Sequence, residues 1–142
     1  MKKILSIIVC SVICFSIFSC VALAYDGEVA PYLNETYGTF SALSFDEYGN
    51  ATVKNSFTGL TGVTTSVTIT TKIQQKFLLF FWRDVDIGVS GNQWVDTSTD
   101  VRFTCSHSVS LPSGTYRAVV TYTVYGTGGE PDVITEYAEA SY

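Results

Sequence analysis

Two stretches of this chain alternate apolar and polar residues with a period of two. The first runs from 101 to 109 and the second from 116 to 124. Because successive side chains of a β-strand point to opposite faces, this alternation is typical of half-buried strands in antiparallel sheets. No stretch of the sequence has the pattern of a convincing amphipathic helix. The chain is therefore expected to fold as an all-β protein.

Shorter alternating runs separated by turn residues continue the pattern. Further strands are expected at 39–45, at 51–57, around 67–73, and from 132 to about 141. The loop Asp-Glu-Tyr-Gly-Asn at 46–50 indicates a hairpin between the first two of these. Roughly seven strands at this spacing predict a single antiparallel β-sandwich with an immunoglobulin-like Greek key, and a barrel is the less favoured alternative.

The sequence Leu-Pro-Ser-Gly-Thr-Tyr at 111–116 supports the sandwich. Its leucine, glycine and tyrosine have the spacing of a tyrosine corner just before a strand. In such a corner the tyrosine hydroxyl bonds to backbone a few residues upstream. The run also approaches the sortase signal LPxTG, but its order differs and no apolar anchor with a basic tail follows, so wall attachment by that route is not expected.

The first 24 residues resemble a secretory signal peptide. Lys2 and Lys3 precede an apolar run, and the small residues Ala22 and Ala24 end it. The run is long enough for a transmembrane anchor, and Cys20 could be lipidated in a bacterial lipoprotein. The small residues favour cleavage after Ala24 over an anchor, and the apolar residues after Cys20 are unlike a lipoprotein tether. We expect a secreted, extracellular protein.

Removal of residues 1–24 leaves a chain from 25 to 142, expected to be one domain, with 25–37 as a possible irregular arm. Three of the four cysteines lie in the leader, so the mature chain keeps Cys105 alone and forms no intramolecular disulfide. Six basic residues remain against 13 acidic ones, a net charge of −7. This balance disfavours nucleic acid and anionic membranes as partners.

Six large apolar residues follow one another at 77–82, Phe-Leu-Leu-Phe-Phe-Trp, without alternation. The favoured interpretation is a central strand covered on both faces, or a strand end that runs into a buried bend, with at least half of these side chains in the core. The alternative is an exposed surface that docks a protein partner, a glycan, another copy of the chain or a lipid headgroup layer.

Cys105 and His107 are two residues apart and share one face of their strand. A thiol beside an imidazole could form a cysteine nucleophile, and a hydrolase is the rival class of function. The same face carries Val101, Phe103 and Val109, which favours a packed cysteine beside a hydrogen-bonded core histidine. We therefore expect no catalytic residues.

Carboxylates offer a second candidate for chemistry. Asp84 and Asp86 could form one side of a calcium site, because calcium prefers oxygen ligands. Further carboxylates are expected in loops, at Asp96, Asp100, Glu130 and Asp132, but no spacing selects them. With one histidine in the chain a two-histidine metal centre is excluded. We expect no metal and no cofactor.

Aromatic residues are the remaining candidates for ligand contact. Most will pack in the core or pair across strands. Four are treated as possible contacts to a protein or a glycan: Trp82, Trp94, Tyr125 and Tyr48.

Several short motifs together resemble the small secreted β-sandwich proteins of unknown function from clostridia and related Gram-positive bacteria. They are the leader, Lys-Ile-Gln-Gln-Lys at 72–76, the run from Phe80 to Trp94, Gly-Thr-Tyr-Arg at 114–117, and the acidic last strand. The resemblance covers about 63–142. It implies an exported protein with no assigned activity.

The expected function is that of a secreted, non-catalytic interaction module at or outside the bacterial cell surface. Recognition would use a strand edge or an aromatic patch. A self-assembling envelope protein and a glycan-binding module remain alternatives, and self-association is possible.

Overall fold

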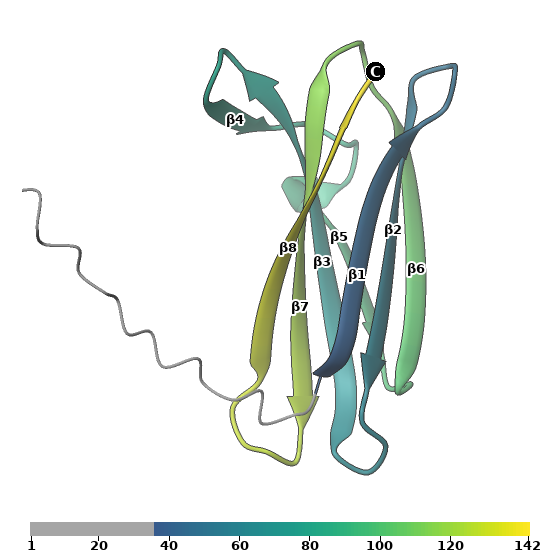
Figure 1. The fold of residues 1–142 in the computed structure, drawn as a ribbon, viewed down its shortest axis with the longest axis vertical. Helices are drawn as coiled ribbons and strands as arrows, with labels where there is room; N and C mark the ends of the chain where they lie inside the picture. Colours follow the sequence, from purple (N-terminus) through teal and green to yellow (C-terminus); the bar gives the residue numbers. More distant parts are fainter. Residues whose placement is uncertain (1–35) are drawn as a thin grey trace, which may run out of the picture. The chain divides into compact units, whose positions relative to one another are not determined.

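The computed structural model describes residues 36–142, and all eight strands and the core lie within them. The elements, shown in Figure 1, are β1 (Thr36–Phe45), β2 (Asn50–Gly59), β3 (Thr64–Phe77), β4 (Phe81–Asp84), the 3₁₀ turn η1 (Ser90–Asn92), β5 (Trp94–Ser98), β6 (Arg102–Ser110), β7 (Thr115–Gly126) and β8 (Asp132–Ser141). This confirms the all-β prediction, with eight strands in place of about seven.

The strands form two antiparallel sheets packed face to face. One has the order β1-β2-β6, and the other has the order β4-β3-β7-β8. β5 also pairs with β3, farther along the edge that β4 occupies. The order matches an immunoglobulin domain, with β1, β2 and β6 in the places of strands A, B and E and β3, β7 and β8 in those of C, F and G. The predicted Greek-key sandwich is confirmed.

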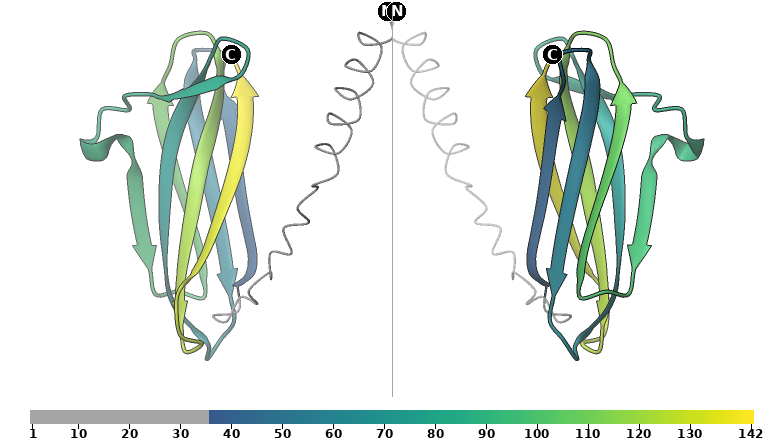
Figure 2. Two further views of the ribbon diagram at one scale, coloured as in Figure 1. Left: turned by 90° about the vertical axis from the view of Figure 1, so that its left-hand side faces the viewer. Right: turned by 90° about the vertical axis from the view of Figure 1, so that its right-hand side faces the viewer.

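The core lies between the inner faces of β2, β3 and β7. Every second residue of β7 from Tyr116 to Val124 is fully buried, as the alternation predicts. β6 alternates in the same way, but its inward side chains are only half-buried because β6 is an edge strand. The segment between β4 and β5 stands out from the two sheets in Figure 2, and it was not predicted to lead into a strand.

Two predicted local motifs are present. Tyr116, at the start of β7, donates a hydrogen bond from its hydroxyl to the carbonyl oxygen of Pro112 at 2.7 Å, which is the contact of a tyrosine corner. The β1–β2 turn is organised by Asp46, whose carboxylate accepts hydrogen bonds from the backbone N–H groups of Tyr48 and Asn50. These bonds and one from the Asn50 side chain, which has the largest effect, lower the pKa of Asp46.

The buried interpretation of the apolar run 77–82 is wrong. The run ends β3, forms the turn to β4 and begins β4, and five of its six residues are exposed. The last residue of β3 that pairs with β7 is Gln75. Beyond Gln75 the strand pairs with β4 alone, so the apolar side chains extend past the part of the sheet that the core covers.

The signal peptide at 1–24, the lipidation alternative at Cys20 and most of the expected arm at 25–37 lie outside the described residues. At the end of that arm, Thr36 and Tyr37 belong to β1.

Candidate functional site

The most conspicuous surface feature is the turn of the β3–β4 hairpin, called here the apolar tip and defined as residues 77–81. Leu78, Leu79 and Phe80 are 70, 76 and 82% exposed, and the flanking Phe77 and Phe81, which pair across the hairpin, are 50 and 63% exposed. Single exposed apolar residues are ordinary, but five in succession at the end of a hairpin mark an interaction site.

The backbone of the apolar tip is strained at one position. Leu78 has φ of 55°, in the left-handed region that glycine or asparagine usually occupies. A branched apolar side chain there costs about 1 kcal/mol relative to glycine. Such strain persists where it serves something other than local stability.

Basic and aromatic side chains surround the base of the hairpin, and we call Lys76, Trp82, Arg83 and Arg117 the collar. The Arg117 guanidinium lies 4.4 Å from the centre of the Trp82 ring, and the Lys76 ammonium lies 5.9 Å from it. Arg83 lies 5.5 Å from the Phe77 ring. Within residues 36–142 none of these three cations forms an ion pair with a carboxylate. Their charge is thus available to a partner.

The four predicted contact aromatics do not form one surface. Tyr125 pairs with Ser66 near one end of β3, and Trp82 pairs with Lys76 near the other. Ten residues of strand separate these positions, about 33 Å. Tyr48 is 75% exposed in the β1–β2 turn. Trp94 is half-buried at the start of β5.

Both tryptophans have neighbours on a ring face. The Trp82 indole has Arg117 over it, and the Trp94 ring is stacked on His107 with centroids 4.9 Å apart and planes 6° apart. Stacking on a sugar requires a free ring face. Each contact covers one face of its ring and so reduces the area that a sugar could stack on at Trp82 and Trp94.

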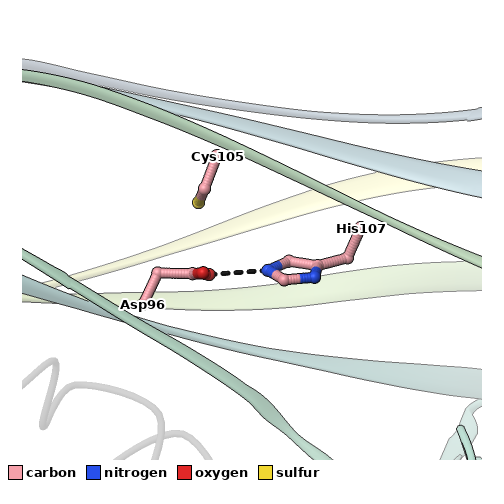
Figure 3. A group of neighbouring side chains, drawn as sticks. All are labelled: Asp96, Cys105 and His107. Carbon is pink, nitrogen blue, oxygen red and sulfur yellow. Dashed lines mark hydrogen bonds and ion pairs between the residues drawn. The ribbon is translucent and has the colours of Figure 1, made fainter.

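Cys105 and His107 do share one face of β6, where both are half-buried and Cys105 packs against the core. They face the neighbouring edge strand β5, from which Asp96 projects toward them (Figure 3). The Nε2 atom of His107 lies 2.7 Å from Oδ2 of Asp96, and both side chains are half-buried. Asp96 therefore lies in a strand, where the sequence analysis expected a loop.

Asp96 and the surrounding core act on the thiol in the same direction. Burial raises the pKa of Cys105, the Asp96 carboxylate raises it further, and the pKa reaches about 11. A cysteine nucleophile needs the opposite, a thiolate at neutral pH. The His107–Asp96 hydrogen bond is compatible with a general base, and it is the raised pKa of the thiol that opposes a nucleophile here. The catalytic interpretation thus has no activated thiol in this arrangement.

The proposed calcium pair is not gathered into a site. Asp84 accepts a hydrogen bond from the Gln74 side chain, and Asp86 accepts one from the backbone of Gly88. In the part of the chain that the structure describes, neither belongs to a group of three potential metal ligands. The group that does form is Asp96, Cys105 and His107.

The fold and these two sites define the protein as an immunoglobulin-like β-sandwich with a protruding apolar hairpin and a mixed side-chain cluster at one edge. No protein-family model, curated protein or solved structure matches the chain. Over residues 36–142 there is no helix with the length and apolar character that crossing a bilayer requires.

Proposed function

We propose that this protein is a secreted, non-catalytic interaction module that binds the surface of a lipid bilayer through the apolar tip of its β3–β4 hairpin. The observation that carries the proposal is the run of five exposed apolar side chains at that tip. Secretion places the domain where it can meet a membrane from outside.

The order of side chains along the hairpin supports a bilayer over a protein groove. Apolar residues come first, then Trp82, then cations. The same order follows the depth of a bilayer, in which hydrocarbon lies below an interface that tryptophan favours and below headgroups that attract lysine and arginine. Three residues of extended chain reach about 10 Å, which is the depth to which interfacial segments insert.

For binding of anionic lipid, the charges near the hairpin matter more than the net charge of the chain. The chain from 25 to 142 is acidic overall, which led the sequence analysis to disfavour anionic membranes. Four of its six basic residues nevertheless lie on β3, β4 and β7 near this hairpin: Lys72, Lys76, Arg83 and Arg117. Two carboxylates lie beside them, Asp84 next to Arg83 on β4 and Glu139 opposite Arg117 on β8, so the basic residues exceed the acidic ones here by four to two. Each basic residue near the surface attracts anionic lipid at about 1 kcal/mol, and repulsion from more distant acidic groups is screened beyond about 10 Å.

The test is binding of residues 25–142 to vesicles of phosphatidylcholine, with and without phosphatidylglycerol. Leu78, Leu79 and Phe80 each contribute about 1.5–3 kcal/mol when buried in the bilayer. The triple variant Leu78→Ser, Leu79→Ser, Phe80→Ser should therefore lose at least about 100-fold in partitioning, measured by co-sedimentation. Its thermal unfolding should match the wild type because the replaced side chains are exposed.

Two further variants separate the contribution of the apolar tip from that of the basic residues. Val133→Ser replaces an exposed valine on β8, remote from the tip, and should bind as the wild type does. Lys76→Gln removes one collar charge and should weaken binding to vesicles with phosphatidylglycerol by about fivefold, with a smaller effect on neutral vesicles. Wild-type protein that stays in solution with both vesicle types contradicts the proposal, and a dimer abolished by the triple variant would assign the tip to self-association instead.

A further inference from the structure

Three side chains with different metal-binding atoms meet between the edge strands of the two sheets. Asp96 comes from β5, and Cys105 and His107 come from β6. The Cys105 sulfur, a His107 ring nitrogen and an Asp96 carboxylate oxygen all lie within 4.8 Å of one another. Figure 3 shows the three side chains pointing into the same space.

This arrangement places the Asp96 carboxylate beside the Cys105 thiol. Among the described residues, His107 is the one basic group in contact with Asp96. Binding a divalent cation would neutralise both the carboxylate and the thiolate that forms when the thiol loses its proton. The Asp96 carboxylate thus becomes a ligand once a cation is present.

A buried amide beside the sulfur is a second, independent observation. Asn55 on β2 is fully buried, and its Nδ2 lies 3.8 Å from the Cys105 sulfur and 2.8 Å from the Thr71 hydroxyl oxygen. Within residues 36–142 its Oδ1 atom has no hydrogen-bond partner. A buried amide oxygen without a hydrogen-bond partner destabilises the fold, so such a position is unusual unless the amide has a functional role. N–H donation to sulfur favours the thiolate, which is the form that a metal binds.

We propose that Asp96, Cys105 and His107 bind a divalent transition-metal ion of the Zn²⁺ type, with a fourth position open to solvent. Sulfur, imidazole and carboxylate together suit Zn²⁺, whereas Ca²⁺ and Mg²⁺ require oxygen ligands. Tetrahedral Zn²⁺ holds its ligands at about 2.0–2.3 Å, so that donor atoms lie about 3.5 Å apart. To reach this spacing, the donor atoms, which lie within 4.8 Å of one another, have to move closer by at most about 1.3 Å, while the 2.7 Å contact between His107 and Asp96 has to lengthen.

Trp94 supports the site from one side. Its ring is stacked in parallel on the His107 imidazole, which limits the rotation of that ligand and excludes water from one face. Neighbours of this kind set ligand orientation and solvent access in metal centres. The proposal does not depend on membrane binding, because the cluster and the apolar tip share no residue.

Co²⁺ is the probe for the ligand set, since its bond to a thiolate gives a charge-transfer band and its tetrahedral complexes absorb in the visible. Residues 25–142, freed of metal with a chelator, contain one cysteine and one histidine. Titration with Co²⁺ should produce both signals at a ratio of one ion per chain, and Zn²⁺ should displace them. Saturation without a thiolate band would overturn the proposal.

Variants then assign the ligands. Cys105→Ser should abolish the thiolate band, and Asp96→Asn and His107→Gln should each weaken Co²⁺ binding by at least about tenfold. Asp100→Asn, two residues beyond β5, is the matched control and should bind as the wild type does. If Cys105→Ser, Asp96→Asn and His107→Gln all bind Co²⁺ with the affinity of the wild type, the proposal is overturned.

A readout on unaltered protein covers the case in which a variant fails to fold. Saturating Zn²⁺ should slow alkylation of Cys105 by iodoacetamide at least about tenfold, because the sulfur becomes a ligand. An alkylation rate that Zn²⁺ leaves unchanged contradicts the assignment of Cys105, whatever the variants do.

Discussion

Burial, and then the neighbouring Asp96 carboxylate, raise the pKa of the Cys105 thiol. The two residues are nine positions apart and come from different sheets. The carboxylate adds to the effect of burial and keeps the sulfur protonated at neutral pH. In the absence of metal the thiol should therefore react slowly, even though its side chain is only half-buried.

Replacing that carboxylate should make the thiol more reactive. Asp96→Asn removes the negative charge, so the pKa of Cys105 should fall toward the value that burial alone sets. One unit of pKa is a tenfold change in thiolate content, and we expect alkylation at pH 8 with a chelator present to accelerate by up to about tenfold. Timed labelling with iodoacetamide followed by mass spectrometry measures the rate.

Asp100→Asn serves as the control here as well, because Asp100 lies in the exposed β5–β6 turn and bonds to Ser98. Its alkylation rate should equal that of the wild type. If Asp96→Asn also labels at the wild-type rate, the carboxylate does not hold the thiol protonated and burial alone accounts for its inertness.

The sequence could predict one half of this cluster. A period of two places Cys105 and His107 on one face of β6. Asp96 could not be assigned to them, because it faces β6 across the gap between the sheets and is paired by hydrogen bonds to β3. That contact depends on how the sheets pack, which strand periodicity does not encode.

At the scale of the elements, the connection from β6 to β7 is fixed by contacts between residues that are close in sequence. Tyr116 is fully buried and its hydroxyl reaches Pro112, so the chain is fixed where it crosses between sheets. The Gln75 side chain adds a hydrogen bond to the same hydroxyl at 3.2 Å. The Tyr116 ring also packs against Phe45 with centroids 5.6 Å apart.

Tyr116→Phe keeps the ring and removes the hydroxyl. The carbonyl of Pro112 loses its donor, so the free energy of unfolding should fall by about 1–2 kcal/mol. Urea denaturation followed by fluorescence measures the loss. Tyr48→Phe, in an exposed turn, should change stability by less than about 0.5 kcal/mol, and an equal effect of the two substitutions would mean that the corner bond contributes nothing.

The β6–β7 corner was predictable because its signal is local, with leucine, glycine and tyrosine within six residues. The β3–β4 hairpin was not, because the same apolar run fits a covered strand or an exposed one. What decides between them is that β7 stops pairing with β3 at Gln75. The length of a neighbouring strand is set elsewhere in the chain, so residues 77–81 carry no local sign of their exposure.

The strand β5 was not predicted, for a related reason. It is five residues long, and its inward side carries Trp94, Asp96 and Ser98, so one of its three inward residues is apolar. A search for alternating apolar residues does not detect such a strand, because its inward residue Asp96 is polar and bonds to His107 of β6. The element that the pattern missed is the one that carries the third member of the side-chain cluster.

At the scale of the whole molecule, polar contacts join the edge strands of the two sheets on both sides of the sandwich. Asp96 meets His107 between β5 and β6, and Thr39 donates a hydrogen bond to Glu136 between β1 and β8. Tyr122 joins the sheets from within, because its ring is fully buried on β7 while its hydroxyl donates to the Phe40 carbonyl of β1 at 2.9 Å. The Ser41 hydroxyl lies 2.7 Å from the Tyr122 hydroxyl oxygen.

Tyr122 should make the stability of the molecule depend on alkaline pH. Burial raises the pKa of its hydroxyl to about 12 in the folded state, whereas a tyrosine in the unfolded chain titrates near 10. The unfolded state therefore loses its proton first as pH rises. The resulting stabilisation is complete below pH 10 and is lost between about pH 10 and 12, with a magnitude of at most about 3 kcal/mol.

Comparison with Tyr122→Phe isolates this contribution. The variant should be less stable by about 1 kcal/mol at pH 8, where the lost hydroxyl leaves the Phe40 carbonyl without its donor. Above pH 10 the gap should narrow and then change sign, because the wild type alone loses the stabilisation of Tyr122, which exceeds about 1 kcal/mol by pH 12. The pKa of Cys105 is also raised, but the thiol is present in both proteins and its effect cancels in the difference. Urea unfolding at intervals from pH 8 to 12 measures both curves, and a constant gap across that range would show that Tyr122 ionises equally in the folded and unfolded chain.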